Sequence, residues 1–141
     1  IMINKVILAV ALCFSPLLVS AESQSFENFI DAQLVVSDIS MTEDGMVITY
    51  EGNVGKYGLV HATHNMTSTN EESTKGYFTG TVQAINDAGE LEKSATLGLW
   101  SRSGTMLKVY GFDDDNASRI LHIADVDLKG KINKVRVWEL D

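Results

Sequence analysis

The fold is decided most clearly by residues 119–140, which read RILHIADVDLKGKINKVRVWEL. In the first half, Ala124 and Val126 lie on one face of an extended chain and Asp125 on the other. In the second half, Val135 alternates in the same way with Arg136. Lys129-Gly130 separates the halves and has the composition of a hairpin turn. The stretch therefore predicts two antiparallel strands with one apolar face.

The same period-two pattern extends back to residue 33. Short runs rich in Val, Ile, Thr, Leu and aromatic residues are separated by Gly, Asp and Asn. We predict eight strands, at about 33–41, 45–51, 57–67, 76–86, 91–101, 105–112, 119–128 and 131–140. Before them, Phe26, Phe29 and Ile30 fit one face of a short helix over residues 24–32.

Eight strands joined mostly by tight turns favour an all-β, antiparallel up-and-down barrel. Closing the sheet removes both unpaired edges, and eight strands enclose a space that side chains or one small ligand can fill. The polar loop at 68–75 leaves a second architecture open, because a crossover there would give a two-sheet β-sandwich.

The expected barrel resembles the architecture of lipocalins and of allene-oxide-cyclase-type barrels. Gly98-Leu99-Trp100 has the Gly-x-Trp form that lipocalins carry near the start of their first strand, but here it lies in the fifth predicted strand. The resemblance concerns architecture alone and implies no function.

The first 21 residues have the features of a cleavable export signal. Lys5 is followed by an apolar run over residues 6–19, and Val19-Ser20-Ala21 provides the small or apolar residues of a cleavage site. The run is shorter than the roughly 20 residues of a membrane-spanning helix. We expect a secreted or periplasmic protein whose mature part, residues 22–141, is one domain without a membrane span.

The mature domain is acidic and has no disulfide available. The formal net charge of the chain is −8, and loss of Lys5 with the signal makes it −9. Such a charge opposes binding to nucleic acid and to anionic membranes. The single cysteine and the single proline of the chain both lie within the predicted signal. The sequence indicates no cofactor and leaves the oligomeric state open.

The sharpest candidates for chemistry are His64 and His122, joined by Tyr50. Alternation places both histidines on inward faces, where imidazoles can act as acid, base or ligand. No carboxylate or thiolate is expected at ligand spacing around either ring, so ordinary packing is the competing interpretation.

A ligand cavity would draw on aromatic side chains as well. We expect Phe78, Trp100 and Tyr110 to line it together with the histidines and Tyr50. The fifth strand leaves its inward face undecided, because Leu97 and Leu99 compete with Trp100 for the interior.

Asp113, Asp114 and Asp115 form a weak candidate calcium site in the loop after the sixth strand. They lack the alternation and the final glutamate of a calcium loop, and a structural turn explains them as well.

These features favour a secreted module that holds a small apolar or amphipathic ligand inside a barrel. A barrel enzyme of isomerase, cyclase or hydrolase type, using the inward histidines as acid and base, is the first alternative. An interaction domain with a filled core is the second. No nucleophile elbow, phosphate-binding loop or dinucleotide fingerprint is present in the sequence.

Overall fold

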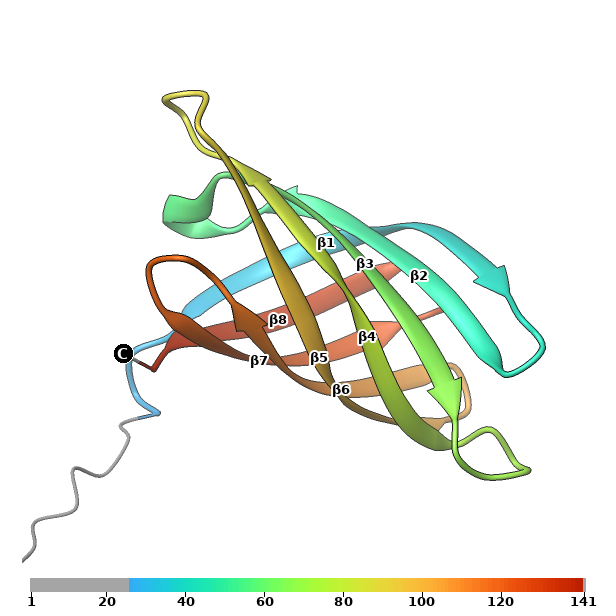
Figure 1. Cartoon of the computed structure of the whole chain (residues 1–141). Helices are drawn as coiled ribbons and strands as arrows, with labels where there is room; N and C mark the ends of the chain where they lie inside the picture. The colour runs from blue at the N-terminus through green and yellow to red at the C-terminus, as the bar shows by residue number, and fades with distance from the viewer. Residues whose placement is uncertain (1–25, 141) are drawn as a thin grey trace, which may run out of the picture.

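The computed structural model describes residues 26–140 and contains one closed antiparallel sheet (Figure 1). Each strand pairs with the next in sequence, and β1 pairs with β8. The strands are β1 (Ile30–Met41), β2 (Gly45–Asn53), β3 (Leu59–Ser68), β4 (Lys75–Ile85), β5 (Leu91–Ser103), β6 (Met106–Asp114), β7 (Arg119–Asp127) and β8 (Ile132–Glu139). The predicted eight-stranded up-and-down barrel is confirmed, and the sandwich alternative is wrong.

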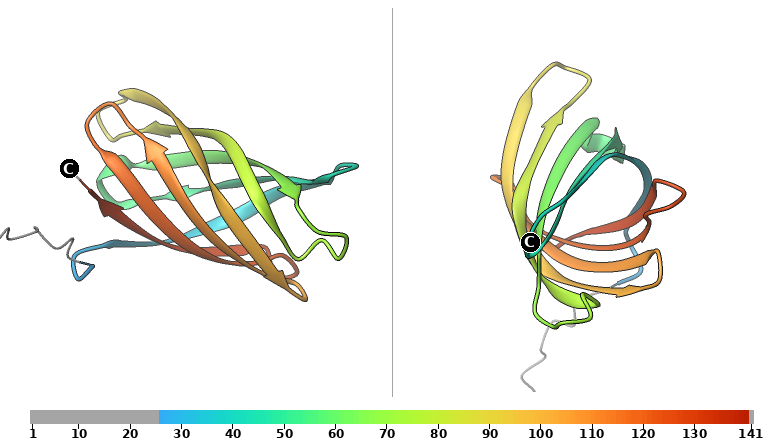
Figure 2. Two further views of the ribbon diagram at one scale, coloured as in Figure 1. Left: turned by 60° about the horizontal axis from the view of Figure 1, so that its bottom comes forward. Right: turned by 90° about the vertical axis from the view of Figure 1, so that its right-hand side faces the viewer.

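The barrel closes through the long first strand. The first part of β1 pairs with β8, from Ile30 opposite Val137 to Val35 opposite Ile132. Its second part pairs with β2, and the register shifts between Val36 and Asp38. Such an irregularity bends a strand. The bend lets the first part of β1 pair with β8 and the second part pair with β2, which closes the barrel (Figure 2).

The helix predicted over residues 24–32 is wrong for its described part. Residues 26–29 are irregular, and Ile30 already belongs to β1. Trp138 explains the difference, because its ring packs against the rings of Phe26 and Phe29, with centroids 5.8 and 5.4 Å away. Its indole nitrogen also donates a hydrogen bond to the carbonyl oxygen of Phe26. Packing across the seam outweighs the local helical preference. Residues 24 and 25 lie outside the described residues.

The two ends of the barrel differ in their connections. One end carries the hairpin loops 42–44, 69–74, 104–105 and 128–131. The other end, which we call the mouth, carries the loops 86–90 and 115–118 and the short 3-10 helix η1 (Gly55–Tyr57). Gly55 and Gly58 flank the turn with φ values of 44° and 78°, which L side chains rarely adopt. These glycines fold η1 back over the mouth.

Trp100, not the neighbouring leucines, points into the barrel. Trp100 is buried and donates its indole N–H to the carbonyl oxygen of Tyr77. Gly76 makes room for it, because a Cβ atom there would lie 3.0 Å from the indole ring. Leu97 and Leu99 consequently face outward and are 56% and 64% exposed.

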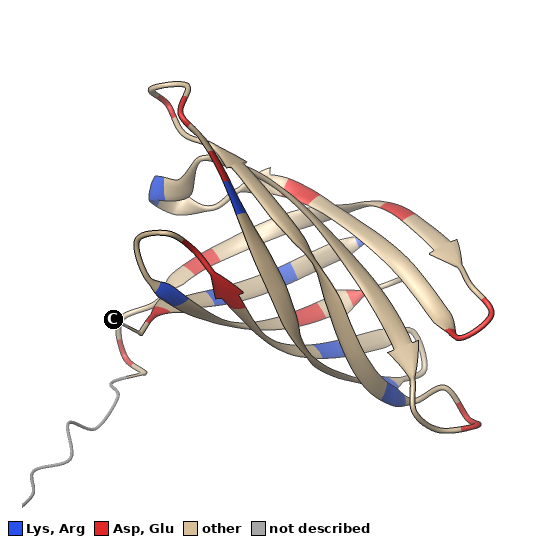
Figure 3. Cartoon of the chain, viewed as in Figure 1, with Lys and Arg blue, Asp and Glu red and all other residues tan. Residues whose placement is uncertain are grey.

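Those leucines belong to an apolar strip on the outside of β4, β5 and β6. Leu99 pairs with Tyr77 and Tyr110, and Leu97 pairs with Phe112. All five side chains are exposed. Figure 3 shows the charged residues of these strands toward the strand ends. Because the outward face of β5 carries these leucines while its inward face carries Ser94, Thr96 and Gly98 beside Trp100, the alternation alone does not identify the inward face.

Within residues 26–140 there is no helix long and apolar enough to cross a bilayer.

Candidate functional site

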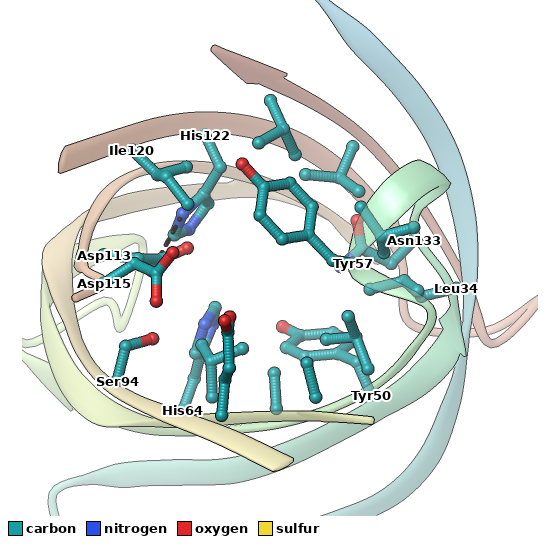
Figure 4. Close-up of a pocket in the computed structure, with 18 residues that line it drawn as sticks. Leu34, Tyr50, Tyr57, His64, Ser94, Asp113, Asp115, Ile120, His122 and Asn133 are labelled. Carbon is teal, nitrogen blue, oxygen red and sulfur yellow. Dashed lines mark ion pairs between the residues drawn. The ribbon is translucent and has the colours of Figure 1, made fainter. Parts of the chain in front are cut away.

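A cavity of about 90 Å³ opens at the mouth and extends into the barrel (Figure 4). Half of the residues in its wall are aliphatic, and five strands contribute larger ones, among them Leu34, Val60, Val82, Ile120 and Val135. The polar side chains of the wall are Tyr50, Tyr57, His64, Glu92, Ser94, Asp113, Asp115, His122 and Asn133. The site therefore combines apolar surface with hydrogen-bonding groups, as small-molecule pockets do.

Glycines on β5 and β6 create the space for the aromatic rings of the site. A Cβ atom at Gly111 would lie 2.4 Å from the tip of the His122 ring, and one at Gly98 would lie 2.9 Å from the ring of Phe78. Gly98 and Gly111 are paired across β5 and β6, so they form one shallow region of the inner wall. The Phe78 ring of β4 and the His122 ring of β7 fill this region.

The structure brings together Tyr50, His64 and His122, the three residues that the sequence analysis grouped. The ring of His64 lies 5.0 Å from that of Tyr50 and 5.8 Å from that of His122, between centroids. Phe78 stacks on His64 with centroids 4.3 Å apart. All four side chains are buried. Tyr50, His64 and His122 line the cavity, and Phe78 supports the His64 ring from inside the core.

Asp113, predicted only as a weak calcium ligand in a loop, belongs to β6 and lines the cavity beside the histidines. Its Oδ1 atom lies 3.3 Å from Nδ1 of His122, so the expectation that no carboxylate approaches the histidines is wrong. Burial raises the pKa of Asp113, but the His122 imidazole and the Thr96 side chain lower it more, and the net pKa lies below its usual value. The cavity wall therefore contains a buried carboxylate that is ionised at neutral pH.

His64 and Tyr50 are held in their neutral forms. Burial and, to a smaller extent, the nearby His122 lower the pKa of His64 to about 3, although Asp113 opposes the shift. Burial also raises the pKa of the Tyr50 phenol well above its ordinary value. At neutral pH the two side chains offer hydrogen bonds without charge.

Several polar atoms of this wall are buried and have no hydrogen-bond partner within residues 26–140. Five of them belong to cavity-lining residues: Tyr50 Oη, His64 Nδ1, Asp113 Oδ1, His122 Nε2 and Asn133 Oδ1. Folded proteins leave few such atoms unpaired, because each costs about 1–3 kcal/mol when desolvated without a partner. A molecule in the cavity would be able to pair with them.

The three consecutive aspartates do not form a metal site. Asp113 faces inward, whereas Asp114 is exposed and lies 3.9 Å from Arg119 Nε through its Oδ1. Asp115 lies at the mouth, where its Oδ1 accepts a hydrogen bond from the backbone N–H of Asn116. Strand alternation separates the first two carboxylates. Among the described residues no group of three or more His, Cys, Asp or Glu side chains is arranged to hold a metal ion.

Three residues expected to line the cavity do not: Phe78, Tyr110 and Trp100. Phe78 is buried in the core, where it stacks on the His64 ring. Tyr110 points outward and is 48% exposed, because Leu107, Val109 and Gly111 occupy the inward positions of β6. Trp100 does point inward, but it lies toward the end opposite the mouth, where it borders a groove that includes Met46 and Ile39. Alternation predicts the face of a residue and not its depth along the barrel axis.

Tyr57 and Glu139 shape the rim of the mouth. Tyr57 extends from η1 into the lining of the cavity, and its hydroxyl donates a hydrogen bond to the Glu139 carboxylate of β8. Lys56 forms an ion pair with the same carboxylate. Hydrogen bonds from Lys56 and Tyr57 keep the pKa of Glu139 below its usual value. These contacts attach η1 to β8 across the mouth.

Comparison with known proteins found no matching family model, no similar curated protein and no similar solved structure.

Proposed function

We propose that the mature domain is exported and binds a small amphipathic molecule inside the barrel. The observation that carries this proposal is the cavity itself, because it opens at the mouth, has a partly aliphatic wall and includes buried polar atoms with no partner in the described structure. An apolar body would lie against Val60, Val82 and Val135. A polar group would bond to Tyr50 and His64.

The volume of the cavity limits the size of the ligand. Pockets for drug-sized molecules measure roughly 300–1,000 Å³, and a cavity of roughly 150 Å³ holds benzene. A cavity of about 90 Å³ fits a molecule of a few carbon atoms, or the apolar end of a longer one that extends through the mouth. The same unfilled volume argues against an interaction domain with a filled core.

Ala84→Phe is expected to abolish ligand binding. Ala84 lines the cavity near the mouth, and a phenyl ring there would occupy the space that we assign to the ligand. Native mass spectrometry of the exported protein, purified without detergent, should show a stoichiometric excess mass that the variant lacks and that denaturation removes. The mass of the bare chain also reports whether cleavage occurs after Ala21.

Ala95→Phe is the matched control. Ala95 lies on the outside of β5, so the same change in size leaves the cavity intact, and the excess mass should remain. If the wild-type protein has a bare mass both as purified and after incubation with a lipid extract of its host, the binding proposal is refuted.

A barrel enzyme is the second candidate function, and the contact between Asp113 and His122 favours it. A carboxylate next to Nδ1 orients an imidazole so that Nε2 is free to accept a proton. The Nε2 atom, however, packs against Gly111 and is buried, which is why we place binding first. Proton transfer would appear as deuterium exchange at an acidic C–H of a bound ketone in D₂O. Exchange that is absent from wild type, or that persists in His122→Gln, would argue against catalysis.

A further inference from the structure

We propose that the ligand is a cation, specifically a small primary amine with a short apolar chain. This inference rests on the proposed binding function and specifies the charge of the ligand. Its basis is a second cavity, of about 180 Å³, that lies directly outside the first. The two cavities share Tyr57, Ala84, Glu92 and Asp115, so they form an inner compartment and an outer vestibule of one site.

The vestibule is strongly acidic. Its lining includes the carboxylates of Glu90, Glu92, Asp115 and Glu139, and Lys56 is the single Lys or Arg among the described residues that line either cavity. Glu139 forms an ion pair with Lys56, which balances one negative charge. The other three carboxylates have no basic side chain beside them in this lining. They favour a cation in the vestibule and repel an anion.

The inner compartment also favours a cation over an anion. Asp113 is an ionised carboxylate within a partly aliphatic wall, and its nearest basic group is the His122 ring. A ligand carboxylate would approach both Asp113 and Asp115, at a cost that rises where water is excluded. The negative net charge of the chain adds long-range attraction for cations.

The buried polar atoms of the inner compartment point to a ligand independently of these charges. Tyr50 is 1% exposed, and its hydroxyl has no partner within the described chain. Figure 4 shows Tyr50 on the side of the opening across from Asp113 and Asp115. The acidic groups therefore border a cavity with its own unpaired hydrogen-bonding atoms and are not an isolated surface cluster.

A primary ammonium group matches this arrangement better than other cations. It carries three N–H donors, which suit several carboxylate acceptors, and charge-assisted hydrogen bonds are the strongest of their kind. A metal ion would require ligands grouped around one point, and no such group of three exists in the described part of the chain. The ammonium group would lie in the inner compartment, whose wall contains Asp113, Asp115 and the unpaired Tyr50 Oη atom, and the apolar chain would lie against the aliphatic part of the wall and extend through the mouth.

The first test compares ligands that differ only in their head group. Isothermal titration calorimetry at pH 7 would measure binding of n-hexylamine, 1-hexanol and hexanoate to the mature protein. We expect hexylamine to bind at least about tenfold more tightly than hexanol, and hexanoate to bind most weakly. Equal affinity for amine and alcohol, or tighter binding of hexanoate, would overturn the cation inference and leave the proposed function standing. If none of the three binds, both are overturned.

The second test removes single carboxylates without changing side-chain shape. Asp115→Asn and Glu92→Gln should each weaken hexylamine binding about five- to tenfold and leave hexanol binding unchanged. The first substitution keeps a side-chain oxygen that can accept the hydrogen bond from the Asn116 backbone. Asp114→Asn is the matched control, because Asp114 is the preceding residue but lies outside the barrel, and it should change neither affinity. Equal losses for amine and alcohol in the first two variants would overturn the assignment.

Discussion

Gly98→Ala is expected to lower the free energy of unfolding by about 3 kcal/mol. A Cβ atom at Gly98 would lie 1.9 Å from the backbone oxygen of Tyr110 and 2.7 Å from Cα of Gly111. Both atoms belong to the backbone of β6, so relief requires a displacement of the strand and not a rotation of a side chain. The same Cβ atom would approach the ring of Phe78 and disturb its stacking on His64. Urea denaturation at pH 7 would measure the loss.

Gly89→Ala provides the comparison, because it makes the same chemical change in open space. Gly89 has a φ of 81° in the β4–β5 hairpin, and no atom lies within 4 Å of the position that a Cβ atom would take there. The expected cost is about 1 kcal/mol and comes from the backbone conformation alone. Equal losses at the two sites would contradict the close approach of β5 and β6 that makes room for the rings of the site.

The extent to which the sequence predicts this fold differs between strands. In β7 and β8, charged residues such as Asp125 and Arg136 alternate with valines, and the faces predicted from that pattern are the observed ones. In β5 the pattern is ambiguous, since Leu97 and Leu99 are as apolar as Trp100. The register there depends on Gly76, on a neighbouring strand, which leaves space for the indole ring. The alternation within β5 does not predict such a contact with a neighbouring strand.

Strand alternation predicts part of the candidate site as well. Inward positions on β2, β3 and β7 follow from alternation and bring Tyr50, His64 and His122 together. The inward position of Asp113 was not predicted, because three aspartates and an asparagine indicate a turn, which placed the end of the strand at residue 112. Continuing the inward series from Leu107 and Val109 by steps of two reaches Asp113. The depth of Trp100 and the shape of the mouth depend on strand tilt and on η1, which alternation does not describe.

Acidification from pH 7 to pH 5 is expected to lower the free energy of unfolding by about 2 kcal/mol through His64. Burial and, to a smaller extent, the nearby His122 lower the pKa of His64 from 6.5 to about 3 in the folded protein. Between these two values the unfolded chain binds more protons than the folded one, so stability rises with pH across this window and falls as the pH decreases. The carboxyl groups titrate mostly below this range, which separates their contribution from that of His64.

His64→Gln should remove this part of the pH dependence, whereas His61→Gln should retain it. His61 and His64 belong to the same strand, but His61 is exposed on the outside and His64 is 5% exposed within the barrel. Urea denaturation at pH 7 and at pH 5 would compare the three proteins. If both variants kept the wild-type difference, a buried neutral His64 would be excluded as its source. His64, which stacks on Phe78 and faces the cavity, would then be protonated at pH 5 in the folded protein, and the neutral form that we assign to it would be wrong.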